Sequence, residues 1–270
     1  MHLFVIKEEK HIIFFVEKLR KVDSCEISSI IHILESKKEH NRFILTYLNA
    51  FNDADDIIIY EYKGTYIANL KGLIISLSYT ENPDPLIRTI LEDMSFRMII
   101  APGEKMGKIL SGIDADERRY ETLMAYKRGE KTIESPARIL DSLEEYHDLF
   151  ELYQGTDEYR NFYSYEDMAR KFRERDEKHF ASAVFCRCKP VSALFVNNGL
   201  IASVATATNE RRKGYARENI LGAIRYYFDR NREENRIYLF YNDNKVKGLY
   251  QGMGFYDVCP FTVIKRRLGK

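Results

Sequence analysis

The chain has 270 residues, enough for one large domain or for two of ordinary size. Its composition, 45% hydrophobic and 31% charged, is that of a globular protein and excludes a chain that is disordered throughout. No apolar run is long enough to span a bilayer, and Glu17 ends the apolar run 11–16 before it could serve as a signal peptide. We therefore expect a cytoplasmic protein without a membrane partner.

The net charge of +1 conceals an uneven distribution. From Ile201 to Lys270 the sequence has fourteen Lys and Arg against seven Asp and Glu, so the rest of the chain is net negative. A basic end suits a small ligand with several phosphates, and no nucleic-acid-binding module accompanies it, so nucleic acid is not expected as a partner. The four cysteines lack the spacing of a metal site. Cys186 and Cys188 are expected in one strand with both side chains on one face, and no metal is predicted.

The first half of the chain is expected to contain helices, a group of strands and further alternating elements. The predicted helices are 8–21, 26–40, a helix that begins after Asn82-Pro83-Asp84-Pro85 and ends at 93, and 104–110; the predicted strands are 56–62, 65–70, 73–79, 96–101 and 120–126. The polar segment 127–131 has no periodicity. We place the domain boundary there, which gives an N-terminal domain 1–128 and a C-terminal domain 129–270.

The second half shows a similar order of elements. The predicted strands are 136–140, 180–187, 190–196, 200–206, 236–241 and 256–265, with a hairpin turn at Lys189-Pro190 and a type I′ turn at Asn198-Gly199; the predicted helices are 143–153, one capped by Ser164 that ends near 174, 215–230 and 245–253. The alternation predicts an α/β fold with a mixed sheet. The shared order of hairpin, strand, helix, strand, short helix and strand suggests an internal duplication.

A basic turn joins the strand 200–206 to the helix 215–230. Its sequence is Arg211-Arg212-Lys213-Gly214-Tyr215-Ala216. The first N–H groups of a helix have no partner within the helix and, together with the helix dipole, attract a phosphate-like anion. Gly214 would let the backbone approach such an anion closely. The corresponding segment of the first half, 80–85, is acidic, contains proline and has no glycine, so no anion site is expected there.

The order of motifs in the C-terminal half resembles the GNAT superfamily of acyl-CoA N-acyltransferases. The matching elements are Val204-Ala205-Thr206, Arg211-x-x-Gly214-x-Ala216, Leu239-Phe240-Tyr241, Asn244 and Leu249-Tyr250-x-x-x-Gly254-Phe255. The whole chain further resembles tandem GNAT proteins whose N-terminal half is degenerate. This resemblance implies two GNAT-like halves, each a mixed and mostly antiparallel sheet flanked by helices.

The resemblance also implies roles for particular residues. The backbone of Val204, Ala205 and Thr206 would pair with the pantetheine arm of acetyl-CoA, on a strand splayed from its neighbour, and a backbone N–H of Thr206 or Val204 would meet the developing oxyanion. Asn244 would hydrogen-bond the pantetheine or its neighbouring backbone, and Tyr250 would protonate the departing thiolate. Lys247 departs from the family pattern, which often has Ala there. Backbone N–H groups from Arg212 to Arg217 would hold the pyrophosphate. The residues of this turn expected to bind the cofactor are Arg211, Arg212, Lys213, Gly214, Tyr215, Ala216 and Arg217.

The implied activity is an acetyl-CoA-dependent N-acetyltransferase that acts on a primary amine of a small molecule or peptide. No cysteine lies at the transfer position, so direct attack in a ternary complex is favoured over an acyl-enzyme. No general base is evident, and Glu210 is expected to be a salt-bridge partner. Glu166, Asp167 and His179 could reach an acceptor pocket, but each also fits an ordinary position on a helix face or a strand edge. The tyrosines at 153, 159, 163 and 165 are expected to serve core packing.

Two other functions stay open. A non-catalytic CoA-binding or regulatory protein would keep the anion turn and lose the transfer residues, whereas Tyr250 and Asn244 are retained. A transferase that takes an aminoacyl group from tRNA would share the two-half layout but would not need the basic glycine turn. The sequence does not identify the acceptor amine, and a homodimer is compatible with it.

Overall fold

The structure is a computed structural model that describes residues 19–23, 25–26, 29–30, 32, 39–41, 57–70, 73–78, 82–129 and 134–266. Most of the predicted helix 8–21 lies outside these ranges. Its last two residues, Arg20–Lys21, form strand β1 instead, because they pair in extended conformation with strand β2. The described residues of the second predicted helix, 26–40, are helical.

The chain forms two compact units. The first contains Met1–Thr122 and Cys259–Lys270, and the second contains Leu123–Val258. Strands β6 (Glu117–Lys127) and β12 (Tyr256–Lys265) therefore each contribute residues to both units. The last strand begins in the second unit and ends in the first, so a single boundary in the sequence does not separate the two units.

The first unit is built on a mostly antiparallel sheet. Its strand order is β1-β2-β3-β4-β5-β12, in which only β4 and β5 pair in parallel. The further elements are β2 (Ile57–Tyr62), β3 (Thr65–Leu70), β4 (Leu73–Ser78), α3 (Ile87–Asp93), β5 (Met98–Pro102) and α4 (Glu104–Leu110). Ile67, Ile74 and Ile264 of the sheet pack against Leu91 of α3 and Leu110 of α4, which makes the core of this unit.

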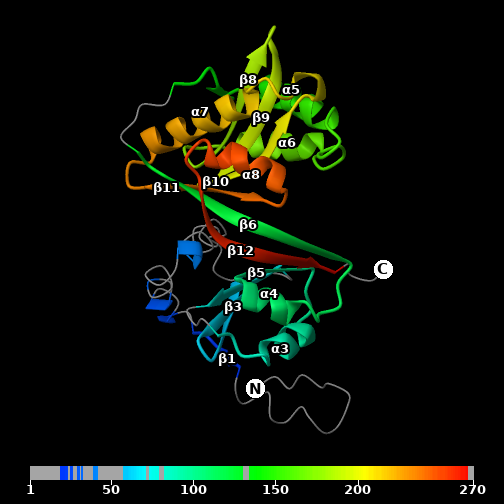
Figure 1. Ribbon diagram of the computed structural model, residues 1–270, viewed down its shortest axis with the longest axis vertical. Coiled ribbons are helices and arrows are strands. Elements are labelled where there is room, and N and C mark those ends of the chain that lie inside the picture. The colour runs from blue at the N-terminus through cyan, green and yellow to red at the C-terminus, as the bar shows by residue number, and fades with distance from the viewer. Residues whose placement is uncertain are drawn as a thin grey trace. The chain divides into compact units, whose positions relative to one another are not determined.

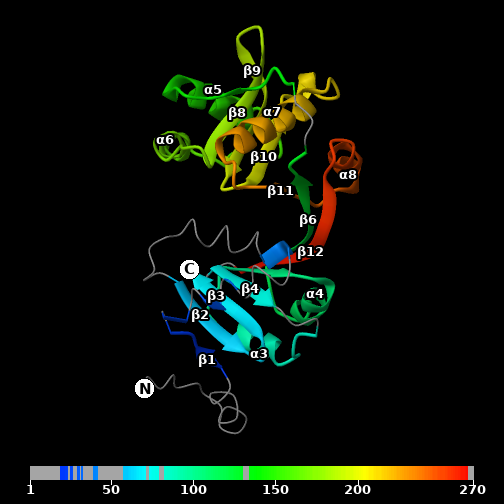
Figure 2. The same cartoon turned by 90° about the vertical axis from the view of Figure 1, so that its left-hand side faces the viewer.

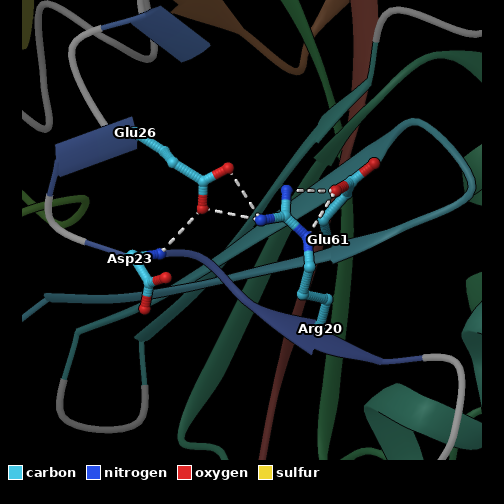
Figure 3. A network of polar contacts seen from close by, with 4 residues as sticks. All are labelled: Arg20, Asp23, Glu26 and Glu61. Carbon is cyan, nitrogen blue, oxygen red and sulfur yellow. Dashed lines mark hydrogen bonds and ion pairs between the residues drawn. The ribbon is translucent and has the colours of Figure 1, made fainter.

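An ion-pair network ties β1 to its surroundings (Figure 3). The guanidinium of Arg20 donates to Glu61 of β2 through Nε at 3.0 Å, and to Glu26 through Nη1 at 2.6 Å. The same Glu26 carboxylate accepts the backbone N–H of Asp23 at 3.2 Å. One arginine thus links the short edge strand to the next strand and to the segment that follows it.

The second unit has a mixed sheet with strand order β6-β11-β10-β9-β8-β7. Within this order β10 and β11 are parallel, whereas the hairpin partners β8 and β9 and β9 and β10 are antiparallel. Its elements are β7 (Arg138–Ile139), α5 (Leu143–Gln154), α6 (Tyr165–Arg173), β8 (His179–Cys186), β9 (Lys189–Asn197), β10 (Leu200–Thr206), α7 (Tyr215–Arg230), β11 (Arg236–Tyr241) and α8 (Asn244–Gln251).

Helices cover both faces of the second sheet (Figures 1 and 2). Alternating residues of β8 face opposite sides: Phe180 packs with α7 and α8, and Ala181 packs with α5 and α6. A buried polar pair fixes α7 on the sheet, because Ser182 Oγ donates to Asn219 Oδ1 at 2.5 Å and Asn219 Nδ2 donates to the Ser182 carbonyl at 3.2 Å. Within the described ranges, no helix is long and apolar enough to cross a membrane.

The two tight turns of the β8-β9-β10 meander test the predicted hairpins. Asn198 and Gly199 have positive φ of 46° and 79°, as the type I′ turn requires, so that prediction is confirmed. The turn predicted at Lys189-Pro190 is wrong. Its central residues are Arg187 and Cys188, with φ of 49° and 64°, so Cys188 lies in the turn and does not share a strand face with Cys186.

The two halves repeat one order of elements, as predicted. In each, an antiparallel meander leads into a parallel strand pair, with one helix between the paired strands and a short helix after them. In each half the turn between the first two strands of the meander has two central residues, Lys63-Gly64 in the first half and Arg187-Cys188 in the second. All four residues have positive φ. The fold is therefore a mixed α/β fold of two similar halves.

Candidate functional site

Strands β10 and β11 pair only at the first two residues of β10. Their parallel register joins Leu200 to Tyr238 and Ile201 to Leu239, and no later pair connects these two fully described strands. Strand β10 continues to Thr206 while still paired with β9 on its other side. We call residues 202–206 the open edge of β10. It is the splayed strand that the sequence resemblance implied.

A bulge at Ser203 shapes the open edge. Ser203 has a φ of +53°, and the register with β9 shifts between Ala202 and Ala205. A bulge re-aims the backbone and is common beside functional sites. Two tyrosines hold it: the hydroxyl of Tyr153 donates to the Ser203 carbonyl at 2.7 Å, and the hydroxyl of Tyr163 lies 2.6 Å from Ser203 Oγ.

Sequence reasoning missed Ser203 and assigned these tyrosines to packing alone. Tyr153 is indeed fully buried and lies 5.3 Å from the ring of Tyr163. Its hydroxyl nevertheless supports the bulge. The signal that could have indicated it is a serine inside an otherwise apolar strand that follows a tyrosine-rich segment.

The hydrogen bonds of β10 determine which backbone groups face the open edge. The N–H of Ala207 donates to the Val191 carbonyl of β9 at 2.9 Å. Because successive residues of a strand alternate in direction, the N–H group of Thr206 points away from β9. The carbonyl of Thr206 accepts a hydrogen bond from Nε of Arg211 at 3.2 Å, and the carbonyl of Ala205 accepts one from Ser192 Oγ at 2.9 Å. The N–H donor of Thr206 is thus directed to the side where β11 has separated.

The turn after β10 presents backbone donors at the start of α7. Gly214 is the N-cap residue, in the left-handed region with φ of +92°, and no side chain caps the helix. The first intrahelical bond that reaches back to the turn is from the Glu218 N–H to the Gly214 carbonyl, at 3.1 Å. The N–H groups of Tyr215, Ala216 and Arg217 are those that a helix start leaves without an intrahelical partner. A Cβ at 214 would meet no protein atom within 4 Å, so the turn is open to a ligand.

Two of the basic side chains near the turn are already paired. Arg211 binds Glu158 at 2.7 Å, and Lys213 binds Glu210 at 2.9 Å, which confirms Glu210 as a salt-bridge partner and raises the pKa of Lys213. Arg212 and Arg217 are exposed and make no ion pair within the described part of the chain. The cationic field at the turn therefore depends on these two arginines and on the helix dipole.

Tyr250 lies on α8, where it is 8% exposed and packs edge-on against Phe255 at 6.1 Å between ring centroids. Burial raises its pKa, so the phenol keeps its proton at neutral pH. Burial also raises the pKa of Tyr159, and the phenols of Tyr163 and Tyr250 raise it further. The ring of Tyr159 packs edge-on against that of Tyr153, with 5.2 Å between the ring centroids, near the bulge at Ser203.

The remaining predicted residues lie as follows. Asn244 is exposed as the first residue of α8, whose N-cap is Asp243. Lys247, which departs from the family pattern, turns aside to bind Asp257 at 2.6 Å. Its long side chain is therefore occupied by an ion pair next to Tyr241, whose ring lies 5.8 Å from its Nζ.

The acids and the histidine considered as bases have structural partners. Asp167 closes the capping box of α6 with Ser164 and pairs with Arg170 at 3.2 Å. His179 Nδ1 lies 3.0 Å from Asp176. Among the described residues, no group of three or more His, Cys, Asp and Glu could hold a metal ion.

The splayed parallel strand pair and the uncapped glycine turn at the start of α7 are two features that the sequence resemblance implied. The comparisons agree with that resemblance. Residues 138–255, which include most of the second unit, match the model of the acetyltransferase (GNAT) family. A search of curated proteins finds no match.

Solved structures share the fold over most of the chain. A Drosophila protein aligns with a TM-score of 0.65 at 10% identity and covers 92% of this chain and 98% of its own. A GCN5-related N-acetyltransferase from Sphaerobacter thermophilus aligns with a TM-score of 0.61 at 12% identity, covering 93% and 96%. One from Kribbella flavida aligns with a TM-score of 0.56 at 14% identity, covering 79% and 88%. At these identities the likeness concerns the fold.

Proposed function

We propose that this protein is an acetyl-CoA-dependent N-acetyltransferase that transfers an acetyl group to a primary amine of a small molecule or peptide. The observation that carries the proposal is the geometry around Gly214. An uncapped helix start with open space at a left-handed glycine directly follows the open edge of β10. This arrangement suits a diphosphate joined to an extended arm.

In this proposal, different residues of the second unit bind different parts of acetyl-CoA. The N–H groups of 215–217, with Arg212 and Arg217, would hold the pyrophosphate. The backbone donors of Val204 and Thr206 would pair with the pantetheine arm, and Asn244 is free at the surface of α8 to bond it. The thioester supplies an activated acyl group.

The chain's own contribution to transfer is orientation and proton handling. Burial raises the pKa of Tyr250, so the phenol is protonated at neutral pH and can donate a hydrogen bond to the departing thiolate, whose thiol has an ordinary pKa of about 8.5. A backbone N–H at the open edge would stabilise the oxyanion as the amine attacks. The cysteines of this unit lie in and beside the β8-β9 turn, away from Tyr250, so we favour direct transfer over an acyl-enzyme.

Two measurements test the proposal. Isothermal titration calorimetry with CoA tests binding, and release of free thiol from acetyl-CoA in the presence of amines and peptides tests transfer. Saturable binding together with amine-dependent thiol release supports the proposal. Binding without release for any amine would favour a non-catalytic CoA-binding protein, and the absence of CoA binding would refute both functions.

A further inference from the structure

Lys171 is a half-buried lysine on α6 with aromatic neighbours. Its Nζ lies 4.5 Å from the ring centroid of Phe195 and 5.7 Å from that of Tyr163. The nearest acids on the same helix, Asp167 and Glu174, both pair with Arg170, at 3.2 Å and 3.7 Å. Within the described part of the chain, no carboxylate forms an ion pair with Lys171.

The position of this ammonium group relates it to the transfer site. Phe195, on β9, pairs with Ala202 of β10, the residue just before the bulge. Tyr163, whose ring Lys171 also faces, bonds the side chain of Ser203 at 2.6 Å. Lys171 therefore lies beside the bulge on the side of α5 and α6, and the pyrophosphate turn is at the other end of β10, beyond Thr206.

An unpaired cation in such a place is unfavourable. Burial, and then the charge of Arg170, lower the pKa of Lys171, which shows that its charged form is disfavoured by the protein. Aromatic faces compensate part of the lost hydration, but they accept no hydrogen bond from the three N–H donors of an ammonium group. A bound anion would supply an opposite charge together with a hydrogen-bond acceptor.

We propose that Lys171 binds a carboxylate of the acceptor, so that the substrates are amino acids or other amines that carry a carboxylate. The inference deepens the proposed function and rests on it. A carboxylate fits better than a phosphate because a single lysine supplies one positive charge, and the neighbouring Arg170 is committed to two acids. The aromatic rings around Nζ leave room for the apolar part of such an acceptor rather than for further ionic contacts.

Acetyl transfer with matched acceptors tests the proposal. We expect the wild-type protein to prefer α-amino acids over their carboxamides in kcat/KM. In Lys171→Met this preference falls by at least about tenfold, the size expected for a lost hydrogen bond to a charged group. The rate with carboxamides and the affinity for CoA stay unchanged, and Lys171→Arg keeps part of the preference. An equal preference in the wild type and Lys171→Met would overturn the proposal.

A binding measurement that needs no transfer separates this proposal from the proposed function. Reductive methylation followed by peptide mass spectrometry reports the accessibility of each lysine, with Lys178, which pairs with Glu234 at 3.7 Å, as the internal control. N-acetylated amino acids should slow the labelling of Lys171 and not of Lys178, and the corresponding amides should protect neither. If no N-acetylated amino acid protects Lys171, the carboxylate site is refuted even where acetyl transfer is found. If protection occurs but thiol release fails with every amine, only the transferase activity is refuted.

Discussion

Substitution of Gly214 separates the conformational role of this residue from its role towards an anion. Any side chain at a φ of +92° is strained, by about 1–2 kcal/mol, whereas the space around a Cβ is free. Gly214→Ala should therefore lower stability by about that amount. Gly214→Asp adds a charge that, at about 4 Å and an effective dielectric constant of about 20, costs about 4 kcal/mol against each unit of anionic charge. We expect a loss of CoA affinity of about a thousandfold.

The first unit offers a control for this experiment. Gly103 is the N-cap residue of α4, with a φ of +89° and no atom within 4 Å of a Cβ, but its ψ of 147° places it outside the left-handed region that Gly214 occupies with a ψ of −9°. Gly103→Asp should therefore be at least as strained as Gly214→Asp and leave CoA affinity unchanged. Calorimetric titration with CoA, together with thermal unfolding of each variant, makes the comparison. A folded Gly214→Asp protein that binds CoA as the wild type does would refute the pyrophosphate assignment.

Three further substitutions test the site and its support. Tyr250→Phe should lower kcat by about tenfold or more while changing CoA affinity little, as steady-state kinetics and calorimetry would show; equal losses would reduce Tyr250 to a packing role. Tyr153→Phe should destabilise the protein by about 1 kcal/mol in denaturant unfolding and also lower kcat, since the bond to Ser203 is lost; unchanged kcat would separate the bulge from transfer. Gly222→Ala should lower the melting temperature, because its Cβ would lie 2.6 Å from another side chain, whereas Gly248→Ala, in open space, should raise it.

Much of the fold could be predicted from local patterns. Strand 200–206, helix 215–230, strand 236–241 and strand 256–265 begin and end where the sequence predicts. Each has a periodic apolar face bounded by polar or turn residues, so short-range information suffices. The hairpin turn at Arg187-Cys188 was not predicted, because neither residue is among those that favour positive φ. There the register of β8 with β9 selects the turn.

The candidate site was only partly accessible to the same reasoning. The motif around Gly214 lies within one continuous segment, and so the turn could be recognised. The bulge at Ser203 depends on hydroxyl groups of Tyr153 and Tyr163, which are 50 and 40 residues away in the chain. The number of charged residues in the basic turn could likewise be read from the sequence, but their partners could not. Arg211 is paired with Glu158, which comes from another part of the sequence.

The two halves differ in the turn that precedes the helix between their parallel strands. In the second half no side chain caps α7, so its first N–H groups are left for a ligand. In the first half Asp84 supplies the anion itself: its Oδ1 accepts the N–H of Leu86 at 2.9 Å, and its Oδ2 pairs with Lys63 at 2.5 Å. Helix α3 has seven residues against sixteen in α7, so its dipole adds less. The turn before α3 thus contains a carboxylate bound to its own backbone and to Lys63, whereas the turn before α7 contains a glycine and exposed arginines, and we expect only the second turn to bind an anion.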